Sequence, residues 1–148
     1  MSVHIREAGE ADLDAVLALY DEIEDGPGQG LTLAQARDVL AQFRRYPSYH
    51  LFVACGVQGA VIGSYALLVM HNLAHRGALS AIVEDVVVTP AAQGQGIGRQ
   101  MMAHALQRAR EAGCYKLALS SNSKRVKAHA FYESLGFAQH GLSFVIEP

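Results

Sequence analysis

An apolar strand that leads through a glycine-rich turn into a helix constrains this fold more than any other feature of the sequence. Residues 80–89 include consecutive valines at 86–88, which indicates a strand buried on both faces. Pro90 ends the strand, and the glycine-rich residues 93–98 precede a helix expected over residues 99–112. A strand, a tight turn and a helix in this order form the first half of a β-α-β unit. We therefore expect part of the sheet to be parallel.

Hydrophobic periodicity predicts the other elements of the chain. Strands are expected at residues 3–6, 49–55, 61–69, 115–121 and 137–146, and helices at residues 10–23, 33–43 and 126–135. Thr32 suits the N-cap of the second helix, Gly113 suits the end of the third, and residues 56–59 suit a hairpin turn. The order β-α-α-β-β-β-α-β-α-β predicts a single domain over residues 1–148 with a mixed sheet, of the α/β or α+β class.

Composition and charge argue against several classes of function. A net charge of −2 disfavours a nucleic-acid-binding surface, which needs a concentrated excess of Lys and Arg. The apolar run at residues 60–70 is interrupted by Gly63 and Ser64, and the charged first ten residues do not resemble a signal peptide. Cys55 and Cys114 lack metal-ligand spacing and are expected to be buried thiols in a reducing compartment. We therefore expect a cytoplasmic protein that binds neither nucleic acid nor membrane.

The glycine-rich turn has the chemistry of an anion-binding site. Glycine permits positive φ angles and a close approach of the backbone to a ligand, and free N–H groups before a helix suit a pyrophosphate. No Gly-Lys-Ser/Thr follows, as a Walker loop requires, and the glycine spacing differs from the dinucleotide-binding fingerprint. A purely structural strand-to-helix turn is the alternative. The candidate binding residues are Gln93, Gly94, Gln95, Gly96, Ile97, Gly98 and Arg99.

Two motifs together resemble one family. Gln93, Gly96 and Gly98 match the acetyl-CoA signature of the GNAT superfamily, which is Gln or Arg, two residues, Gly, any residue, then Gly or Ala. Residues 128–137, with their Phe-Tyr and Gly-Phe pairs, look like the second signature of that superfamily. The spacing of the motifs and the predicted order of elements are also similar. The chain thus resembles GNAT N-acetyltransferases over essentially its whole length.

The resemblance implies how a coenzyme would be held. It implies a splayed sheet with coenzyme A between the strand ending near Thr89 and the one ending near Ser120. The loop amides would hold the pyrophosphate, and the backbone of Val86, Val87 and Val88 would pair with the pantetheine arm. The resemblance also implies that the chain uses acetyl-CoA as cosubstrate. It would then be an acetyl-CoA-dependent N-acetyltransferase, which is a kind of acyltransferase.

A basic cluster and one departure from the family pattern concern the nucleotide end of the coenzyme. Lys124, Arg125 and Lys127 lie at positions where members of the family often contact the nucleotide of the coenzyme. The alternative is that these charged side chains only begin a helix and face water. Many GNAT enzymes carry Asn seven positions before the motif Tyr, and this sequence has Arg125 there. Asn122 is the substitute candidate for a contact with pantetheine or adenine. Arg125 and Asn122 are therefore both candidate coenzyme-binding residues.

Two finer resemblances bear on the acceptor. Residues 84–88 with 113–117 resemble glucosamine-6-phosphate N-acetyltransferases, whereas residues 119–132 resemble aminoalkylphosphonate acetyltransferases. Both imply a primary amine on a small, anionic molecule. The alternatives are a protein or peptide N-acetyltransferase, with an acceptor groove shaped by residues 25–30 and 44–47, and an acetyl-CoA sensor without turnover. A homodimer is the family-level expectation, with the carboxy-terminal strand as a pairing edge.

The reaction needs a proton acceptor, because an amine with a pKa of about 10.4 is protonated at neutral pH. Glu84 is the candidate base, since it precedes the strand segment expected to line the acetyl site, where partial burial would raise its pKa. Asp85 is the second choice, because strand alternation points it to the opposite face unless a bulge intervenes. Ordinary strand-edge carboxylates are the alternative. Tyr132, the Tyr of the Phe-Tyr motif, is the candidate general acid, or else a core aromatic residue.

Other polar side chains complete the set of candidates. Asp85, His75 and Ser120 are candidate substrate-binding residues. His71 and His75 also suit a divalent ion, although loop histidines are more often solvated. The sequence carries no His-x-His or Cys/His metal set, so no metal ligand is assigned, and the aminoalkylphosphonate resemblance keeps a divalent metal as an open alternative. Cys114 at a helix end is a poor nucleophile.

Overall fold

The structure is a computed structural model that describes residues 1–22 and 30–148. It divides into two compact units, Met1–Ala118 and Leu119–Pro148. The end of the first predicted helix at residue 23 and most of the predicted groove segment at residues 25–30 lie outside the described residues. No helix of the described part is long and apolar enough to cross a membrane.

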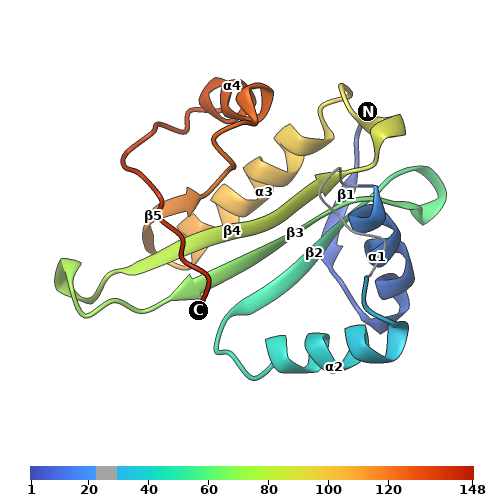
Figure 1. The fold of residues 1–148 in the computed structure, drawn as a ribbon, viewed down its shortest axis with the longest axis horizontal. Coiled ribbons are helices and arrows are strands. Elements are labelled where there is room, and N and C mark those ends of the chain that lie inside the picture. Colours follow the sequence, from blue (N-terminus) through green and yellow to red (C-terminus); the bar gives the residue numbers. More distant parts are fainter. Residues whose placement is uncertain (23–29) are drawn as a thin grey trace. The chain divides into compact units, whose positions relative to one another are not determined.

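A five-stranded mixed sheet forms the centre of the first unit (Figure 1). Its strands are β1 (His4–Glu7), β2 (Tyr49–Cys55), β3 (Val61–Met70), β4 (Leu79–Val88) and β5 (Cys114–Leu119), in that spatial order. The pairs β1–β2, β2–β3 and β3–β4 are antiparallel. The β4-α3-β5 connection is the crossover that a β-α-β unit requires, as the sequence predicts.

Helices cover both faces of this sheet. The helices of the first unit are α1 (Leu13–Asp21), α2 (Leu33–Phe43) and α3 (Ile97–Glu111), with short 3-10 turns at Glu10–Asp12, Val57–Gly59, His75–Gly77 and Pro90–Ala92. Helix α1 packs against β3 and β4, α2 against β2, and α3 against β3 and β4. Ala66 of β3 belongs to the core formed with α1 and α2, whereas the neighbouring Tyr65 bonds to His104 of α3. Since successive strand residues face opposite sides, α3 lies on the face opposite to α1 and α2.

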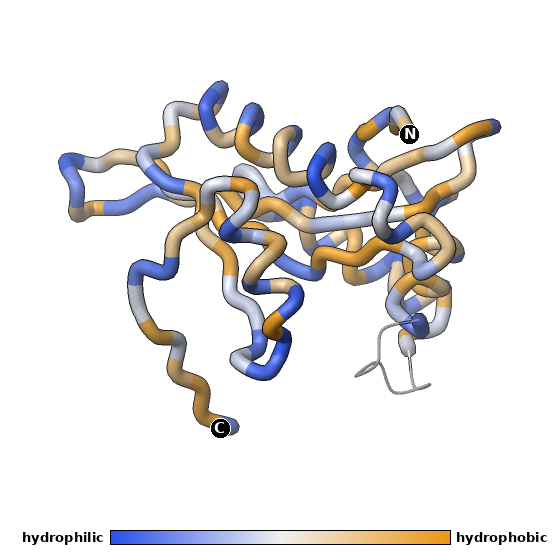
Figure 2. Tube along the Cα trace, turned by 90° about the horizontal axis from the view of Figure 1, so that it is seen from above, coloured by the Kyte–Doolittle hydropathy of each residue, from blue (hydrophilic) through white to orange (hydrophobic). Residues whose placement is uncertain are grey.

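Apolar side chains at regular spacing explain this packing. On α3, buried residues recur every fourth position at Ile97, Met101, Ala105 and Ala109, and Met102 is buried beside them. This spacing places one apolar stripe against the sheet. The hydropathy colouring alternates along α3 in the same way (Figure 2). The opposite core contains Ala8, Leu13, Val16, Ala36, Leu40, Leu51, Val53, Cys55 and Ala66.

The helix boundaries follow the predicted signals. The Thr32 hydroxyl accepts a hydrogen bond from the N–H of Gln35 at 3.2 Å, and the Gln35 side chain accepts one from the N–H of Thr32 at 2.9 Å. This reciprocal cap confirms Thr32 as the start of α2. Gly113 follows α3 with a φ of 79°, a conformation that glycine adopts without steric cost.

The second unit contains helix α4 (Val126–Ser134) followed by residues 135–148 without helix or strand. The strand predicted at residues 137–146 is therefore wrong. Its β-branched and aromatic residues favour an extended chain, but a strand is stable only when a neighbour completes its hydrogen bonds and covers its apolar face. Leu142, Phe144, Val145 and Ile146 are 84–96% exposed, so no such neighbour covers them.

An ion pair between an exposed guanidinium and a buried carboxylate ties β1 to the turn before α1. The Arg6 guanidinium donates to both carboxylate oxygens of Asp12 at 2.8 Å, and the N–H of Gly9 donates to Asp12 at 2.8 Å. Asp12 is buried. The hydrogen bonds from Arg6 hold the pKa of the Asp12 carboxyl below its ordinary value, against the opposing effect of burial. This pair fixes where the chain leaves the sheet and enters α1.

We predict that Asp12→Asn lowers the free energy of unfolding by about 2 kcal/mol at pH 7, since charge-assisted hydrogen bonds are lost. A carboxylate with a lowered pKa in the folded state stabilises the fold above its unfolded pKa, and this contribution is lost as the pH falls through the folded pKa. Urea unfolding at several pH values should give a constant difference near neutrality that shrinks below about pH 4. Glu10→Gln, at an exposed position nearby, is the control. A difference that grows in acid would contradict the prediction.

Candidate functional site

A β-bulge in β4 carries the two candidate carboxylates. Ala66 of β3 pairs with Glu84 and Ser64 pairs with Val87, so the single residue between them, Tyr65, opposes both Asp85 and Val86. Asp85 has a φ of 54°. Such a left-handed conformation is uncommon outside glycine, although Asp adopts it more readily than most residues. The predicted alternative of a bulge is thus what the structure contains.

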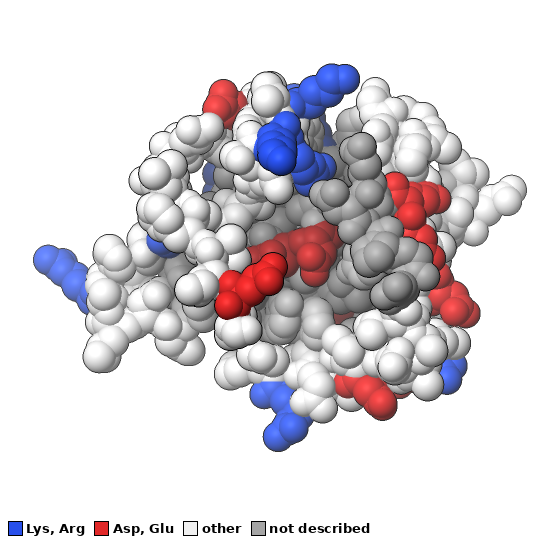
Figure 3. Space-filling view, viewed as in Figure 1, with Lys and Arg blue, Asp and Glu red and all other residues white. Residues whose placement is uncertain are grey.

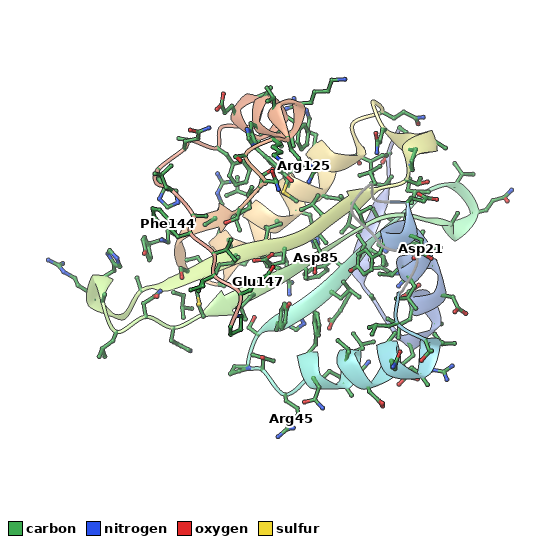
Figure 4. The ribbon with its side chains drawn as sticks, viewed as in Figure 1. Asp21, Arg45, Asp85, Arg125, Phe144 and Glu147 are labelled. Atoms are coloured by element: carbon green, nitrogen blue, oxygen red, sulfur yellow. The ribbon has the colours of Figure 1, made fainter. Side chains whose placement is uncertain are left out.

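The bulge changes which way the carboxylates point. Glu84 lies opposite Ala66 and therefore shares the face covered by α1 and α2. Asp85 lies close enough to Tyr20 of α1 and to Tyr49 of β2 that its charge raises the pKa of both phenols. Figure 4 shows Asp85 on this face, and Figure 3 shows acidic atoms at the same place. The prediction that alternation sends Asp85 to the opposite face is wrong, because the extra residue of the bulge interrupts the alternation.

Tyrosines that the sequence analysis missed surround this face. Burial, followed by the charge of Asp85, raises the pKa of Tyr20 to about 12. Burial likewise raises the pKa of Tyr49, whose ring stacks on Phe43 at 3.9 Å and meets Tyr46 edge-on at 5.3 Å. The helical and strand periodicity of Tyr20 and Tyr49 indicates only that both side chains belong to the core. Their proximity to the carboxylates depends on the bulge, which no sequence signal marks.

Exposure of the carboxylates differs from the expectation. Glu84 and Asp85 are both exposed, so the partial burial predicted for Glu84 is not found. Of the three valines that follow, Val87 is buried, whereas Val86 and Val88 are half-buried. The predicted burial on both faces is therefore wrong for Val86 and Val88, because β4 ends at Val88, at the margin of the sheet.

The glycine-rich turn presents a continuous row of N–H groups. Gly94 and Gly96 have φ angles of 78° and 81°, as predicted for a turn that needs glycine. Within residues 1–22 and 30–148, the N–H groups of residues 94–99 donate no hydrogen bond, and the first N–H of the α3 ladder is that of Gln100, bonded to Gly96 at 3.1 Å. Apart from the flanking residues, no heavy atom in the described part of the chain lies within 4 Å of a Cβ placed on Gly94 or Gly96. The turn thus combines open space with unpaired donors at a helix N-terminus.

Side chains of the turn hold its shape. The Gln93 amide donates to the Val88 carbonyl at 3.1 Å, and the Gln95 amide donates to the Ala91 carbonyl at 3.3 Å. These bonds tie the turn to the end of β4. Gln93 and Gln95 therefore stabilise the backbone in the structure, while Arg99 on the first turn of α3 is exposed.

In the second unit, Tyr132 lies on α4 between two other aromatic rings. Its ring centre is 5.2 Å from that of Phe131 and 5.8 Å from that of Phe137. Burial raises the pKa of the Tyr132 phenol, and the Arg125 charge opposes this effect. The N–H of Phe137 donates to the Tyr132 carbonyl at 3.1 Å. The Gly-Phe pair of the motif therefore folds back onto the Phe-Tyr pair.

The turn before α4 uses Asn122 as a structural residue. The Asn122 side-chain oxygen accepts from the N–H of Lys124 at 2.9 Å, and its carbonyl accepts from the N–H of Arg125 at 3.0 Å and bonds the His129 ring at 2.7 Å. Lys124, Arg125 and Lys127 are exposed. Ser120 bonds to Ser143 at 3.2 Å, whereas the neighbouring Ser121 hydroxyl is buried without a partner in the described part of the chain.

The histidines of the β3–β4 hairpin lie away from the carboxylates. His75 sits in the hairpin turn with a φ of 54°, and its ring lies 4.7 Å from that of Tyr115 of β5. The five steps along the strand from Leu79 to Glu84 alone span about 16 Å. His71, in the same hairpin as His75, lines a pocket with Tyr46, Pro47, Ser48, Leu68, Val69, Met70, Leu79 and Ala112. The described residues contain no group of three or more His, Cys, Asp or Glu side chains that could hold a metal ion.

The cysteines play no visible part in these arrangements. Cys55 is buried in the core, as predicted, and Cys114 is half-buried at the start of β5. Burial raises the pKa of the Cys114 thiol, which makes it a poor nucleophile.

The fold and the turn define a class: an α/β protein with a loop suited to an anionic group before the helix that follows β4. The Acetyltransferase (GNAT) family model matches residues 16–137. The glucosamine 6-phosphate N-acetyltransferase of Trypanosoma brucei brucei is 31% identical over 142 residues, which cover 95% of this chain and 92% of that protein. The aminoalkylphosphonate N-acetyltransferase of Salmonella typhimurium is 34% identical over 140 residues, 95% of this chain and 88% of that protein.

A solved structure gives the same assignment. A Trypanosoma brucei acetyltransferase superposes with a TM-score of 0.85 at 28% identity, over 99% of this chain and 100% of that chain. The chain belongs to the GNAT acetyltransferase family and is an acetyltransferase. GNAT acetyltransferases use acetyl-CoA as cosubstrate. The resemblance of motifs and the predicted fold class are confirmed.

We predict that Gly96→Val weakens acetyl-CoA binding by at least tenfold, because a β-branched residue disfavours the positive φ and its side chain fills the open space above the row of N–H groups. Isothermal titration with acetyl-CoA measures the effect. Gly113→Val is the matched control, since Gly113 has a φ of 79° and equally open surroundings but lies at the far end of α3. Equal affinity in both variants would reject the turn as the binding site.

Proposed function

We propose that this chain transfers the acetyl group of acetyl-CoA to a primary amine of a small molecule by direct attack in a ternary complex. The observation that carries the proposal is the row of unpaired N–H groups at residues 94–99. A pyrophosphate is the anion that such a row at a helix N-terminus suits. The relatives named above act on an amino sugar phosphate and an aminoalkylphosphonate, which favours a small, anionic amine.

The remaining coenzyme contacts are proposed from residues of both units. In the first unit, Val86, Val87 and Val88 offer backbone groups at the end of β4, and Arg99 adds a positive charge beside the turn. In the second unit, Arg125 and the free amide nitrogen of Asn122 are the candidates, and the unpartnered Ser121 hydroxyl is a further polar group available to a ligand. We also infer that the two units work as one domain, because the family model spans the boundary between them.

The carboxylates of the bulge are proposed to prepare the acceptor. Glu84 accepts the proton that the ammonium group must lose, directly or through water, so that the nitrogen lone pair can form the C–N bond as the C–S bond breaks. Asp85 binds the acceptor beside it. The bulge supports this division, since it turns both carboxylates to one face beside Tyr20 and Tyr49. His75 and Ser120 remain proposed acceptor contacts for a longer substrate.

We predict that Glu84→Gln lowers kcat/KM for the acceptor about a hundredfold at pH 7, because proton removal is lost. Raising the pH should restore part of the activity, since the free amine becomes more abundant. Asp85→Asn keeps a residue that tolerates positive φ and should raise KM for the acceptor with a smaller effect on kcat. Steady-state kinetics of both variants between pH 6 and 10 measure these effects. A larger kcat loss in Asp85→Asn would reverse the two roles.

Tyr132 is proposed to assist the departing thiolate. A thiol has a pKa of about 8.5 and a phenol of about 10, so proton transfer from Tyr132 to the thiolate is uphill by about 2 kcal/mol. Burial raises the pKa of Tyr132 further and makes complete transfer harder. The same shift keeps the hydroxyl protonated through the neutral range. Tyr132 therefore acts chiefly as a hydrogen-bond donor to the sulfur, and the thiolate takes its proton in the end through Tyr132 or from water.

We predict that Tyr132→Phe lowers kcat by about ten- to a thousandfold with little change in the affinity for acetyl-CoA. The ring and its packing between Phe131 and Phe137 are kept, so the loss reports the hydroxyl alone. Tyr115→Phe, on an exposed strand position, is the control. Stopped-flow or steady-state thiol release gives kcat, and calorimetry gives the affinity. An unchanged kcat would remove Tyr132 from the mechanism.

The acceptor is tested by thiol release from acetyl-CoA with a panel of amines. The panel holds aminoalkylphosphonates, glucosamine 6-phosphate, polyamines, aminoglycosides and short peptides, each with and without divalent metal. Turnover of a small anionic amine supports the proposal, and metal dependence would identify a divalent ion as a further requirement. Turnover of peptides alone would favour the alternative of a protein or peptide N-acetyltransferase. Acetyl-CoA binding without any turnover would favour the alternative of a non-catalytic sensor.

We further propose a cytoplasmic homodimer. The apolar side chains before the C-terminus are exposed, and the segment appears as a hydrophobic stretch in Figure 2; they are Leu142, Phe144, Val145 and Ile146. A second copy of the chain would give this segment the strand partner that it lacks. Sedimentation velocity of the protein and of Phe144→Asp measures the association. A monomeric wild-type protein would contradict the proposed dimer. The proposed cytoplasmic location is tested separately, by cell fractionation.

A further inference from the structure

We infer that Tyr65 and His104 are positioning residues that hold the bulge of β4, and with it Glu84 and Asp85, in the orientation for transfer. This inference rests on the proposed function of the two carboxylates and adds residues that do not touch a substrate. It starts from the register of the sheet, in which Tyr65 is the residue of β3 that faces the two bulged residues of β4.

The Tyr65 side chain leaves the sheet on the face opposite to the carboxylates. It is fully buried, and its hydroxyl lies 2.6 Å from Nδ1 of His104 on α3. A second strand completes the arrangement, because the Phe52 ring of β2 stacks on Tyr65 at 5.3 Å and meets the His104 ring edge-on at 4.9 Å. The guanidinium of Arg108 lies 5.6 Å from the centre of the Phe52 ring. Tyr65 is therefore a fully buried side chain whose hydroxyl bonds to the half-buried His104, and its ring has little freedom to turn.

Helix α3 also contacts β3 on the other side of the bulge. A Cβ added to Gly63 would come within 3.0 Å of the Met101 sulfur and 3.2 Å of the Val87 carbonyl oxygen. Helix α3 thus packs closely against β3 at Gly63 and is hydrogen-bonded to β3 at Tyr65. These two residues are two positions apart and face the same side of the sheet. Between these contacts lies Ser64, which pairs with Val87 just beyond the bulge.

These contacts, on the face of the sheet covered by α3, restrain the bulge that contains Asp85. Asp85 holds a positive φ that persists only when its surroundings favour it. The surroundings on one side are solvent and the tyrosines of α1 and β2, because both carboxylates are exposed. On the other side they are Tyr65 and, through its hydroxyl, His104. Loss of this bond lets Tyr65 and the bulge shift by a fraction of an ångström, enough to misplace a proton acceptor.

The test is a double-mutant cycle on kcat/KM for the acceptor found in the panel. Tyr65→Phe and His104→Ala should each lower it about tenfold while the affinity for acetyl-CoA stays the same. The double variant should also lose about tenfold rather than about a hundredfold, because the two residues act through one bond. His104→Asn, whose side-chain amide can accept or donate a hydrogen bond in place of Nδ1, should regain most of the activity. Gln107→Ala, on the exposed side of α3, is the control.

A readout without turnover separates this inference from the proposed function. The backbone amide resonances of Asp85 and Val86 should shift in Tyr65→Phe and His104→Ala and return toward their wild-type positions in His104→Asn. Additive losses, or full activity in both single variants, would overturn the inference. So would a lower melting temperature with unchanged kinetics and unchanged amide resonances of the bulge. If no amine is turned over, the proposed function fails, and these amide resonances alone decide whether the pair holds the bulge.

Discussion

The packing of α3 against β3 and β4 is the contact on which the rest of this structure depends. The helix places an apolar stripe on the sheet, and its close approach is possible because Gly63 has no side chain. The same helix begins with the row of unpaired N–H groups and, two turns later, carries His104 beneath the bulge. One rigid element therefore connects the proposed coenzyme turn to the strand that carries the carboxylates.

Local chemistry explains why much of the fold was predictable from the sequence. Thr32 and Gly113 are signals that act within a few residues, and the structure uses them as expected. The apolar periodicity of α3 and the glycines of the turn are equally local. The prediction of a closing strand was wrong, because β-propensity indicates a strand only where a neighbouring strand is present. In the described part of the chain, the apolar side chains of residues 142–146 are exposed.

The candidate site was predictable in part, for a different reason. The turn and Tyr132 belong to motifs, so their positions could be named. The bulge at Asp85 depends on the register between β3 and β4, which is a non-local property and leaves no mark in the spacing of residues. The sequence therefore allowed a bulge only as an alternative, and the closeness of Tyr20 and Tyr49 to the carboxylates was missed. A buried tyrosine looks like any core aromatic residue until its hydroxyl partner is known.

The row of N–H groups at residues 94–99 has a consequence for how such a chain can diverge. Recognition by main-chain groups does not depend on which side chains occupy most of these positions, provided the glycines keep their conformation. Substitution of an exposed side chain that does not brace the turn therefore leaves this row of donors in place, whereas every substitution on the carboxylate face changes the groups that a ligand meets there. A family built on this plan can exchange acceptors freely and keep one donor.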